Sequence, residues 1–412
     1  MLILSHPTGN EFVRYALRGL LDENYLHQYY TSIACFEGDL LFNLGQFKQL
    51  SELRKRVYDN SLKGKIKTSS YDEWMRQLAI KIGAKSLFKH EFGRFSVDAV
   101  YRKHDLFVAK NIRFNRNRNI NGVIAYEDAA QSTFQVAKEL NLTRYYDLSI
   151  GYWKYAKTIL ELEKERNPAY ASTLTGLFNS DEKLAKKDSE LALSDHIIVA
   201  SQFTKETLSA YNGKLSPISV IPYGFPPVSD NYKIKSDLPI VPLKLLFVGG
   251  LTQRKGIAEV FEAVKGFKQH IELTVIGRKT GFDCPILDRE LLKHRYIPSL
   301  NHKLILEEMA NHHVLIFPSL FEGFGMVISE AMSQGTPVIT TKRTAAADFI
   351  EHKKNGWLVE PNNVDQIKTI ISELLISPNL INEIGVAAQN TARNRPWSMY
   401  SKEMAAFTIN NI

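Results

Sequence analysis

The chain has 412 residues and a net charge of +8, and 44% of its residues are hydrophobic and 23% charged. These values are ordinary for a folded globular protein, and the length suits two domains of roughly 150–200 residues better than one core. The two cysteines, Cys35 and Cys284, exclude a disulfide scaffold or a cysteine-based metal site and favour a reducing cytoplasm, and no run of about 18 apolar residues predicts a membrane span.

The first predicted strand is the apolar segment "MLIL" at residues 1–4, which lacks the basic start of a signal peptide. In the following segment, "SHPTGNEFVRYALRGL" (5–20), Gly9 and Asn10 open a helix. A glycine turn at the end of a strand can approach a phosphate closely. We expect His6 to be a structural residue of this turn rather than a catalyst. The chain has no G-x-x-x-x-G-K-[S/T] and no G-x-G-x-x-G pattern, so neither a P-loop enzyme nor a nicotinamide dehydrogenase is supported.

Most of the positive charge lies in the next segment. Between Lys48 and Lys89 there are eleven Lys or Arg residues and four Asp or Glu residues, a net +7 in 42 residues. One interpretation is a patch for anionic lipid head groups, and an equally weighted one is a solvated helix face that keeps the protein soluble. Nucleic acid is not expected as a partner, because the aromatic residues are not interleaved with the basic ones.

Strands and helices then alternate. "GVIAY" (122–126), "HIIVA" (196–200) and "SVIPY" (219–223) predict buried strands, with helices expected at 128–140 and 203–211. Glu127 and Asp128 follow one of these strands, where they could contact a substrate or cap the next helix; we favour capping for Asp128. The proline-rich segment 223–242 interrupts the alternation and predicts a linker between two domains.

The second half repeats the pattern with strands predicted at 243–250, 271–277, 313–319 and 336–341. Such alternation indicates right-handed βαβ units, so the expected fold is α/β, with two Rossmann-like doubly wound domains facing across a cleft. We place the domains at 1–230 and 231–394, followed by a helix at 395–412. In these folds ligands bind at the carboxyl ends of the strands.

One such strand end carries the sequence "FEGFG" (321–325). Gly323 and Gly325 permit a tight turn and a close ligand approach, and a helix is predicted from about Gly325 until Gly335. The start of this helix suits a phosphate or a sugar oxygen. Glu322 lies on the turn and Glu330 eight residues later, a spacing that lets two carboxylates hold hydroxyls on either side of a diphosphate. The alternative is that Glu330 is an ordinary exposed helix residue.

The segment "FPSLFEGFGMVISEAMSQGTPVIT" (317–340), followed by "NGWLVEP" (355–361), resembles the donor-binding segment of the family-4 retaining glycosyltransferases of GT-B fold, the group 1 type. Their signature of a Glu, seven residues and a second Glu corresponds to Glu322 and Glu330. "LLFVGGLTQRKGI" (245–257), "SDHIIVASQFTKETL" (194–208) and "VIPYGF" (220–225) are also similar to family segments. The resemblance extends from about residue 120 to 400.

The resemblance implies roles for individual residues. Glu330 would accept hydrogen bonds from a nucleotide ribose, and Glu322 would contact the transferred sugar. Arg254 and Lys255 would pair with the diphosphate and neutralise the charge that grows on it. The implied catalytic residues are Arg254, Lys255 and Glu322, and to these we add Asp147 as a catalytic candidate. The implied donor-binding residues are Gly9, Asn10, Gly250, Ile297 (near the base), Phe324, Gly325, Met326, Val327 and Glu330.

The sequence departs from the family at two places. Many members carry Arg where this chain has Gly250, and we expect Arg254 beside Lys255 to supply that charge. Many also have a His at the end of a first-domain strand, whereas "RYYDLSIGYW" (144–153) has none. Asp147 is the nearest polar residue; it could bind a sugar hydroxyl or stabilise charge at the anomeric carbon, or be an N-cap or loop acid.

The function implied by the resemblance is retaining transfer of a hexose from a nucleotide-diphosphate sugar to a glycan or lipid-linked acceptor, in bacterial surface-polysaccharide synthesis. The sequence has no Asp-x-Asp pair and no His/Cys cluster at ligand spacing, so we expect no metal and no other cofactor. The expected location is cytoplasmic, with peripheral attachment to the inner face of the membrane as a hypothesis. In the resembling family the terminal helix crosses back onto the first domain. The alternatives are a sugar-nucleotide epimerase of the same architecture and a non-catalytic GT-B subunit.

Overall fold

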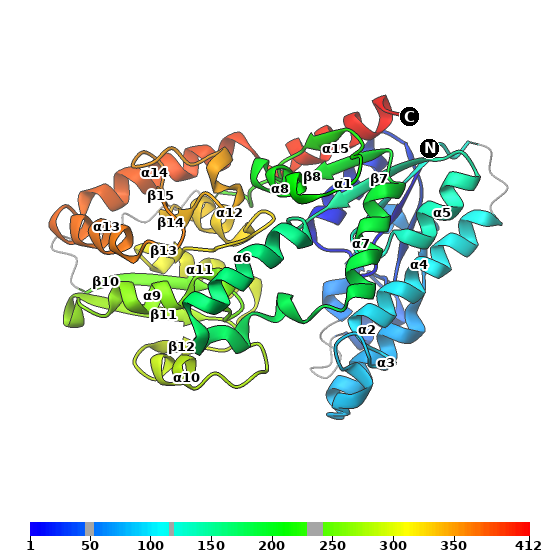
Figure 1. Ribbon diagram of the computed structural model, residues 1–412. Helices are drawn as coiled ribbons and strands as arrows, with labels where there is room; N and C mark the ends of the chain where they lie inside the picture. Colours follow the sequence, from blue (N-terminus) through cyan, green and yellow to red (C-terminus); the bar gives the residue numbers. More distant parts are fainter. Residues whose placement is uncertain (46–52, 115–118, 229–241) are drawn as a thin grey trace.

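A computed structural model describes residues 1–45, 53–114, 119–228 and 242–412. Two α/β lobes lie side by side, and helix α6 (Trp153–Arg166) lies between them (Figure 1). Each lobe is built on one parallel sheet with helices on its faces, as the alternating sequence pattern predicts.

The first domain contains a seven-stranded sheet of order β5-β2-β1-β6-β7-β8-β9, in which every pairing is parallel. Its strands are β1 (Leu2–Ser5), β2 (Leu26–Thr31), β5 (Ile66–Thr68), β6 (Gly122–Tyr126), β7 (Thr143–Leu148), β8 (His196–Val199) and β9 (Ile218–Val220). A separate pair is formed by β3 (Cys35–Phe36) and β4 (Val57–Tyr58). Its helices besides α6 are α1 (Glu11–Asp22), α2 (Leu40–Leu44), α3 (Ser70–Lys81), α4 (Val97–Arg113), α5 (Gln131–Glu139), α7 (Asp181–Leu193) and α8 (Gln202–Thr207).

The second domain has a six-stranded parallel sheet of order β12-β11-β10-β13-β14-β15. Its strands are β10 (Leu243–Val248), β11 (Ile271–Ile276), β12 (Arg295–Ile297), β13 (Val314–Phe317), β14 (Val338–Thr341) and β15 (Trp357–Val359). Its helices are α9 (Ile257–Val264), α10 (Pro285–Leu291), α11 (His302–Asn311), α12 (Met326–Ser333), α13 (Val364–Ile376) and α14 (Asn379–Asn394), after which α15 (Trp397–Asn410) completes the chain.

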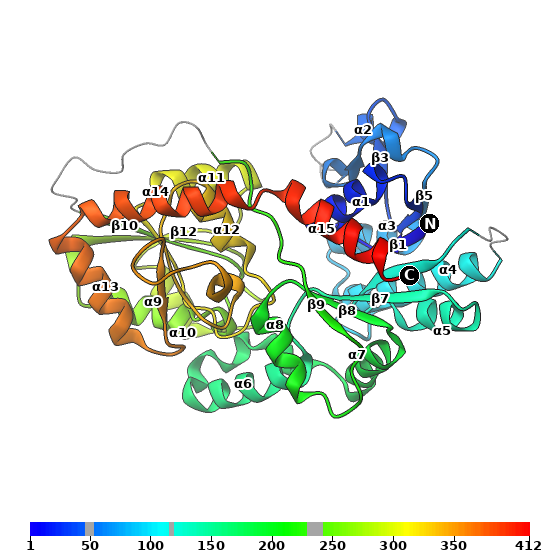
Figure 2. The same cartoon turned by 90° about the horizontal axis from the view of Figure 1, so that it is seen from above.

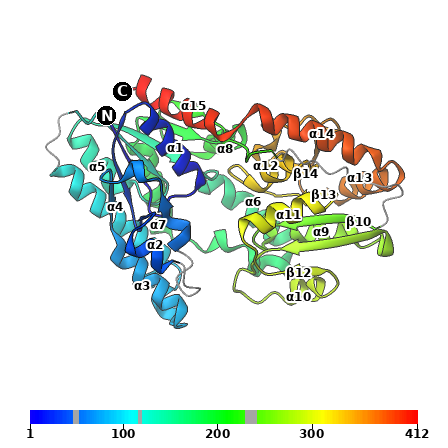
Figure 3. The ribbon, with the colours of Figure 1, turned by 180° about the vertical axis from the view of Figure 1, so that it is seen from behind.

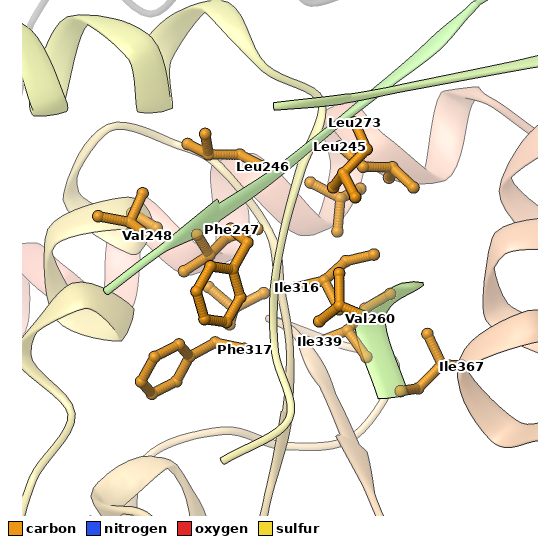
Figure 4. Packing of buried hydrophobic residues seen from close by; sticks show 14 of the residues in the cluster. Leu245, Leu246, Phe247, Val248, Val260, Leu273, Ile316, Phe317, Ile339 and Ile367 are labelled. Carbon is orange, nitrogen blue, oxygen red and sulfur yellow. The ribbon is translucent and has the colours of Figure 1, made fainter. Parts of the chain in front are cut away.

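The apolar strands of the second domain are buried on both faces. Leu246 and Val248 lie on one side of β10, and Leu245 and Phe247 lie on the other, where the Phe247 ring is 6.1 Å from that of Phe317 between centroids (Figure 4). Because helices cover both faces of such a sheet, its strands are continuous apolar runs rather than alternating ones. This packing fixes the strand ends, and therefore the loops that line the cleft.

The terminal helix α15 crosses back and packs on α1 of the first domain, as the resemblance implied (Figures 2 and 3). The approach is close, since a Cβ atom added to Gly19 would lie 2.0 Å from the carbonyl oxygen of Ser401. The centre of the predicted linker, residues 229–241, lies outside the described residues, as does the domain boundary placed at 230/231. Within the part of the chain that is described, no single helix is long and apolar enough to cross a bilayer, although α13 and α14, bent by 111° to each other, meet the length and composition criteria as a pair.

Candidate functional site

The turn after β13 carries Glu322 between two cations. Its carboxylate oxygen Oε1 lies 3.0 Å from Arg254 Nη1 and 3.2 Å from Lys255 Nζ. Burial alone would raise the pKa of Glu322, but the charges of Arg254 and Lys255 lower it below its usual range. The backbone N–H of Glu322 donates to the carbonyl of Arg343 at 3.1 Å. The structure thus brings Glu322 into contact with Arg254 and Lys255, which lie far from it in sequence.

The two cations come from a short 3₁₀ turn, Gln253–Lys255, at the end of β10. The Arg254 guanidinium also donates to the carbonyl of Phe321, and the Lys255 ammonium lies 5.0 Å from the centre of the Phe317 ring. Burial lowers the pKa of Lys255, and the Glu322 carboxylate opposes this change. Both charges are therefore held in place by the turn that carries Glu322.

Glycines leave room around this cluster. Gly249 has φ +150°, and a Cβ there would lie 3.2 Å from Lys255 Nζ. At Gly250 a Cβ would meet no atom within 4 Å, so the position where many family members carry Arg is open. Helix α12 begins directly after the Glu322 turn, with Gly325 at φ +83° as its N-cap. The backbone of Phe324, Gly325, Met326 and Val327 therefore lies where the partial positive charge of a helix start is available to an anion.

Glu330 lies on α12, and its side chain is only 13% exposed. Its Oε1 lies 3.1 Å from Nε2 of His302, the first residue of α11. The hydrogen bond with Glu330 raises the pKa of His302. Burial opposes this increase, and the charges of Glu330 and of Glu11 at the start of α1 add to the increase. Glu330 is therefore not an ordinary exposed residue. The sequence reasoning missed His302, because nothing in the local pattern distinguishes it from any polar residue in a helix's first turn.

Ile297, which the resemblance places near the nucleotide base, ends β12 at the carboxyl edge of the same sheet. It is half-buried, and its carbonyl accepts a hydrogen bond of 3.0 Å from the backbone N–H of Gly277. The second domain therefore places Ile297, Glu330, Gly250, the two cations and Glu322 along connected strand ends and the helix that follows them.

On the first domain, the turn after β1 is organised by His6. Its Nδ1 accepts hydrogen bonds from the backbone N–H groups of Thr8 at 3.0 Å and Gly9 at 2.9 Å. Burial lowers the pKa of His6 to about 3, so the ring is neutral and serves the turn, as expected. Gly9 has φ +62°, and a Cβ there would lie 1.8 Å from the Tyr58 hydroxyl, so any other residue would be strained and would displace Tyr58. Asn10 is the N-cap of α1 and accepts a hydrogen bond from the Thr8 hydroxyl through its side-chain oxygen, at 3.0 Å.

Asp147 lies inside β7 and is 2% exposed, so the alternatives of an N-cap or a loop acid do not apply. The Ser149 hydroxyl donates to its Oδ1 at 3.1 Å, while Oδ2 has no hydrogen-bond partner among the described residues. The buried hydroxyls of Tyr126 and Tyr400 also lack one in that part of the chain. Burial raises the pKa of Asp147 to about 7, which leaves a carboxyl that is neutral or charged within the physiological range.

The expected capping role of Asp128 is wrong. The N-cap of α5 is Ala130, and the N–H groups of Ser132 and Thr133 are bound instead by the Asp105 carboxylate, at 2.7 and 2.9 Å. Asp128 takes a positive φ of +71° and points its carboxylate at Lys187, 3.1 Å away. The helix N-terminus is thus satisfied by a residue of α4, which the local sequence around position 128 does not reveal.

Part of the chain matches a known protein family. Residues 229–391 match the family model described as glycosyl transferases group 1. The amylovoran biosynthesis glycosyltransferase AmsK of Erwinia amylovora is 27% identical over 199 residues, which cover 44% of this chain and 48% of AmsK. The chain thus spans about half the length of the curated relatives it matches.

Solved structures match over nearly the whole chain. A sucrose-phosphate synthase from Thermosynechococcus elongatus has a TM-score of 0.68 at 17% identity, covering 99% of this chain and 98% of the other. HepE of Anabaena, in a complex with UDP and glucose, has a TM-score of 0.63 at 16% identity, covering 100% and 99%. At these identities the likeness establishes the two-domain fold. Among the described residues, no group of three or more His, Cys, Asp or Glu side chains is arranged to hold a metal ion.

Proposed function

We propose that the chain transfers a sugar, with retention of configuration, from a nucleotide-diphosphate sugar to a glycan or lipid-linked acceptor. The basis of the proposal is that the chain belongs to the glycosyl transferase group 1 family through residues 229–391 and has the GT-B fold. The observation that carries the proposal is the partly buried cluster of Glu322, Arg254 and Lys255 at the start of α12, with Glu330 further along the helix.

The cluster supports a leaving-group mechanism. When the glycosidic bond breaks, negative charge grows on the departing diphosphate, and Arg254 and Lys255 are already fixed where they can neutralise it. Glu322 keeps both cations in place and presents its carboxylate to the hydroxyls of the transferred sugar. Glu330, which is hydrogen-bonded to His302, would accept hydrogen bonds from the ribose hydroxyls. No step requires a metal or another cofactor in this proposal.

The first donor to test is UDP-glucose. HepE of Anabaena was solved with UDP and glucose, and a related fold from E. coli was solved with UDP-2-fluoro-glucose. We infer a surface polysaccharide as the product class because one relative, 29% identical over 194 residues, is named a lipopolysaccharide 1,6-galactosyltransferase. Analysis of the product distinguishes this transferase from an epimerase, and absence of turnover with any nucleotide sugar would indicate a non-catalytic subunit.

The direct test is thermal stabilisation of the purified protein by UDP, GDP, TDP and their sugars. A ligand at about 100 times its Kd stabilises the folded state by about 2.7 kcal/mol, which is visible in a melting curve. We expect one base to produce this shift, and Glu330→Ala to abolish it. Glu351→Ala, at an exposed glutamate of the same domain, is the matched control and should keep the shift. No shift with any nucleotide near millimolar concentration would contradict the proposal.

Peripheral membrane attachment at the cytoplasmic face is supported by the region around α3. Its exposed side includes apolar residues, with Leu78, Ile82 and Phe92 exposed by 48%, 67% and 79%. Lys81, Lys85 and Lys89 are exposed beside them in sequence. Apolar side chains with lysines suit an anionic bilayer surface. The part of the basic segment at 48–52 lies outside the described residues.

Flotation with vesicles that contain anionic lipid tests this attachment. Wild-type protein should float at low salt, and Ile82→Glu with Phe92→Glu should not. Leu292→Glu, which replaces an 87% exposed leucine on the second domain, is the control and should float like wild type. Wild-type protein that stays at the bottom of the gradient at low salt would contradict membrane attachment without affecting the transferase proposal.

A further inference from the structure

A pocket of about 250 Å³ lies between the two domains, beside the cation cluster. Its first-domain wall comes from α6 and from the 3₁₀ turn Thr175–Phe178, and its second-domain wall from Thr252, Arg254 and Phe321. We call residues 153–178 the bridging arm, because they leave the first domain and pack on the second (Figure 1).

Buried hydrogen bonds hold the bridging arm against the second domain. The Gln253 amide nitrogen donates to Glu163 of the arm and to Glu259 of α9, both at 2.8 Å. The Thr173 hydroxyl accepts from the backbone N–H of Gln253 at 2.9 Å. Gln253 directly precedes Arg254, so the same turn that carries the cations also fixes the wall of the pocket.

Through Arg254 the pocket adjoins the cation cluster of the proposed reaction. Arg254 lines the pocket and is bonded to Glu322, and Phe321 directly precedes Glu322. In a displacement that retains configuration from the front side, the attacking hydroxyl approaches on the face of the departing phosphate. That phosphate is assigned to Arg254 and Lys255, so a hydroxyl presented from this pocket arrives beside it.

The first-domain lining also carries an ion pair that is nearly buried. Glu127 Oε2 lies 2.8 Å from Lys187 Nζ, and the two side chains are 11% and 8% exposed. Burial and the nearby Asp128 raise the pKa of Glu127, and Lys187 opposes both. Holding a buried ion pair at a pocket wall has a desolvation cost. Such a pair can accept and donate hydrogen bonds to vicinal hydroxyl groups.

The remaining lining suits the C–H face of a sugar ring. Leu160, Leu174 and Leu177 provide aliphatic surface, and the indole of Trp153 is held by a 2.7 Å hydrogen bond from its N–H to Asp188. The volume is slightly below the range of about 300–1,000 Å³ typical of pockets for drug-sized ligands. One sugar residue fits this size, with any further residues of a glycan outside.

We propose that this pocket binds the terminal sugar of the acceptor, with its hydroxyls held by Glu127 and Lys187 and its attacking hydroxyl beside Arg254. This inference rests on the proposed transferase function. The acceptor oxygen forms a bond to the anomeric carbon as the bond from that carbon to the phosphate oxygen breaks. The hydroxyl proton passes to the departing phosphate, so no further base and no co-reactant is required.

The test fills the pocket mouth with a large side chain. Thr175 is exposed at the rim, and Thr175→Trp narrows the entrance without replacing a core residue. Thr158→Trp, at an exposed position of α6 outside the pocket, is the matched control. With UDP-glucose as donor, two rates are measured. The first is glucose transfer to the methyl glycosides of glucose, galactose and mannose, and the second is hydrolysis of UDP-glucose by water. Thr175→Trp should lower the ratio of transfer to water reaction by about tenfold or more, and Thr158→Trp should leave it unchanged.

Saturation-transfer NMR with the same glycosides tests the pocket without any donor. The signal of the best glycoside should be present in wild type and Thr158→Trp and lost in Thr175→Trp. An unchanged signal or an unchanged transfer ratio in Thr175→Trp would overturn the inference, as would the absence of a signal for all three glycosides in wild type. Failure of the transferase proposal itself shows separately, as the absence of nucleotide-induced stabilisation.

Discussion

Asp147→Asn removes a titrating carboxyl from the interior of the first domain and keeps the shape of the side chain. In the folded protein burial raises the pKa of Asp147 from an ordinary value of 3.8 to about 7. Between these two pH values the unfolded chain loses a proton that the folded chain keeps. The free energy of unfolding of wild type therefore falls by about 1.4 kcal/mol for each pH unit in this window, and it stays level above it.

The variant lacks this dependence. From pH 5 to pH 7 the wild type should lose about 2 kcal/mol of stability relative to Asp147→Asn. For a domain of this size such a loss corresponds to roughly 4–8 °C in Tm.

The assay is a series of melting curves of both proteins from pH 4.5 to pH 8.5 at constant ionic strength. The Tm of Asp147→Asn minus that of wild type should rise up to about pH 7 and then remain constant. Asp22→Asn, at an exposed residue of α1, makes the same change of charge at the surface and serves as control. A difference that is the same at pH 5 and pH 8 would refute the reasoning, because it would show that Asp147 is charged throughout.

Three further predictions concern the second domain. Glu322→Gln removes the carboxylate that is proposed to contact the transferred sugar, which UDP lacks; we expect turnover to fall by about 10²–10³-fold and the Kd for UDP, measured by calorimetry, to change much less. His302→Gln should lower Tm at pH 6 but not at pH 8.5, because the folded pKa of His302 is raised above 6.5, so its contribution is complete below that value and is lost as the pH rises through the folded pKa. An equal deficit at both pH values would contradict this. Gly256→Ala should destabilise the protein in urea unfolding by more than about 1 kcal/mol, since φ is +71° and a Cβ would lie 2.3 Å from the Pro318 carbonyl oxygen, whereas Gly266→Ala, with open space around it, should have little effect.

The fold could be predicted because its information is local. Runs such as "HIIVA" and "LKLLFV" are apolar except for His196 and Lys244, as expected for strands buried on both faces of a parallel sheet. Strand β2, "LHQYYT", mixes polar and aromatic residues and gave no such signal, although five of its six residues are buried. The helix predicted at 128–140 begins only at Gln131, because Asp105 of another helix provides its cap.

The site was predictable where its residues share one segment or one family motif. The turn at Glu322 and the pair Arg254 and Lys255 belong to glycine-rich strand ends, and the structure brings them together. The partners of Glu127 and Glu330, which are Lys187 and His302, were not predictable. They are 60 and 28 residues away in sequence, and only the packing of α7 and α11 brings them close.

The contact between α1 and α15 has a consequence for the order in which the protein is made. The core of the first domain includes Trp397, Tyr400 and Met404 of α15, and the Tyr145 hydroxyl donates to the carbonyl of Thr408 at 2.8 Å. A ribosome that has finished the last strand of this domain must still translate the whole second domain before it reaches α15. At about 5–20 residues per second this takes on the order of ten to thirty seconds. During that time the face of α1 that α15 will cover has no native partner, so the first domain to be synthesised is the last to complete its core.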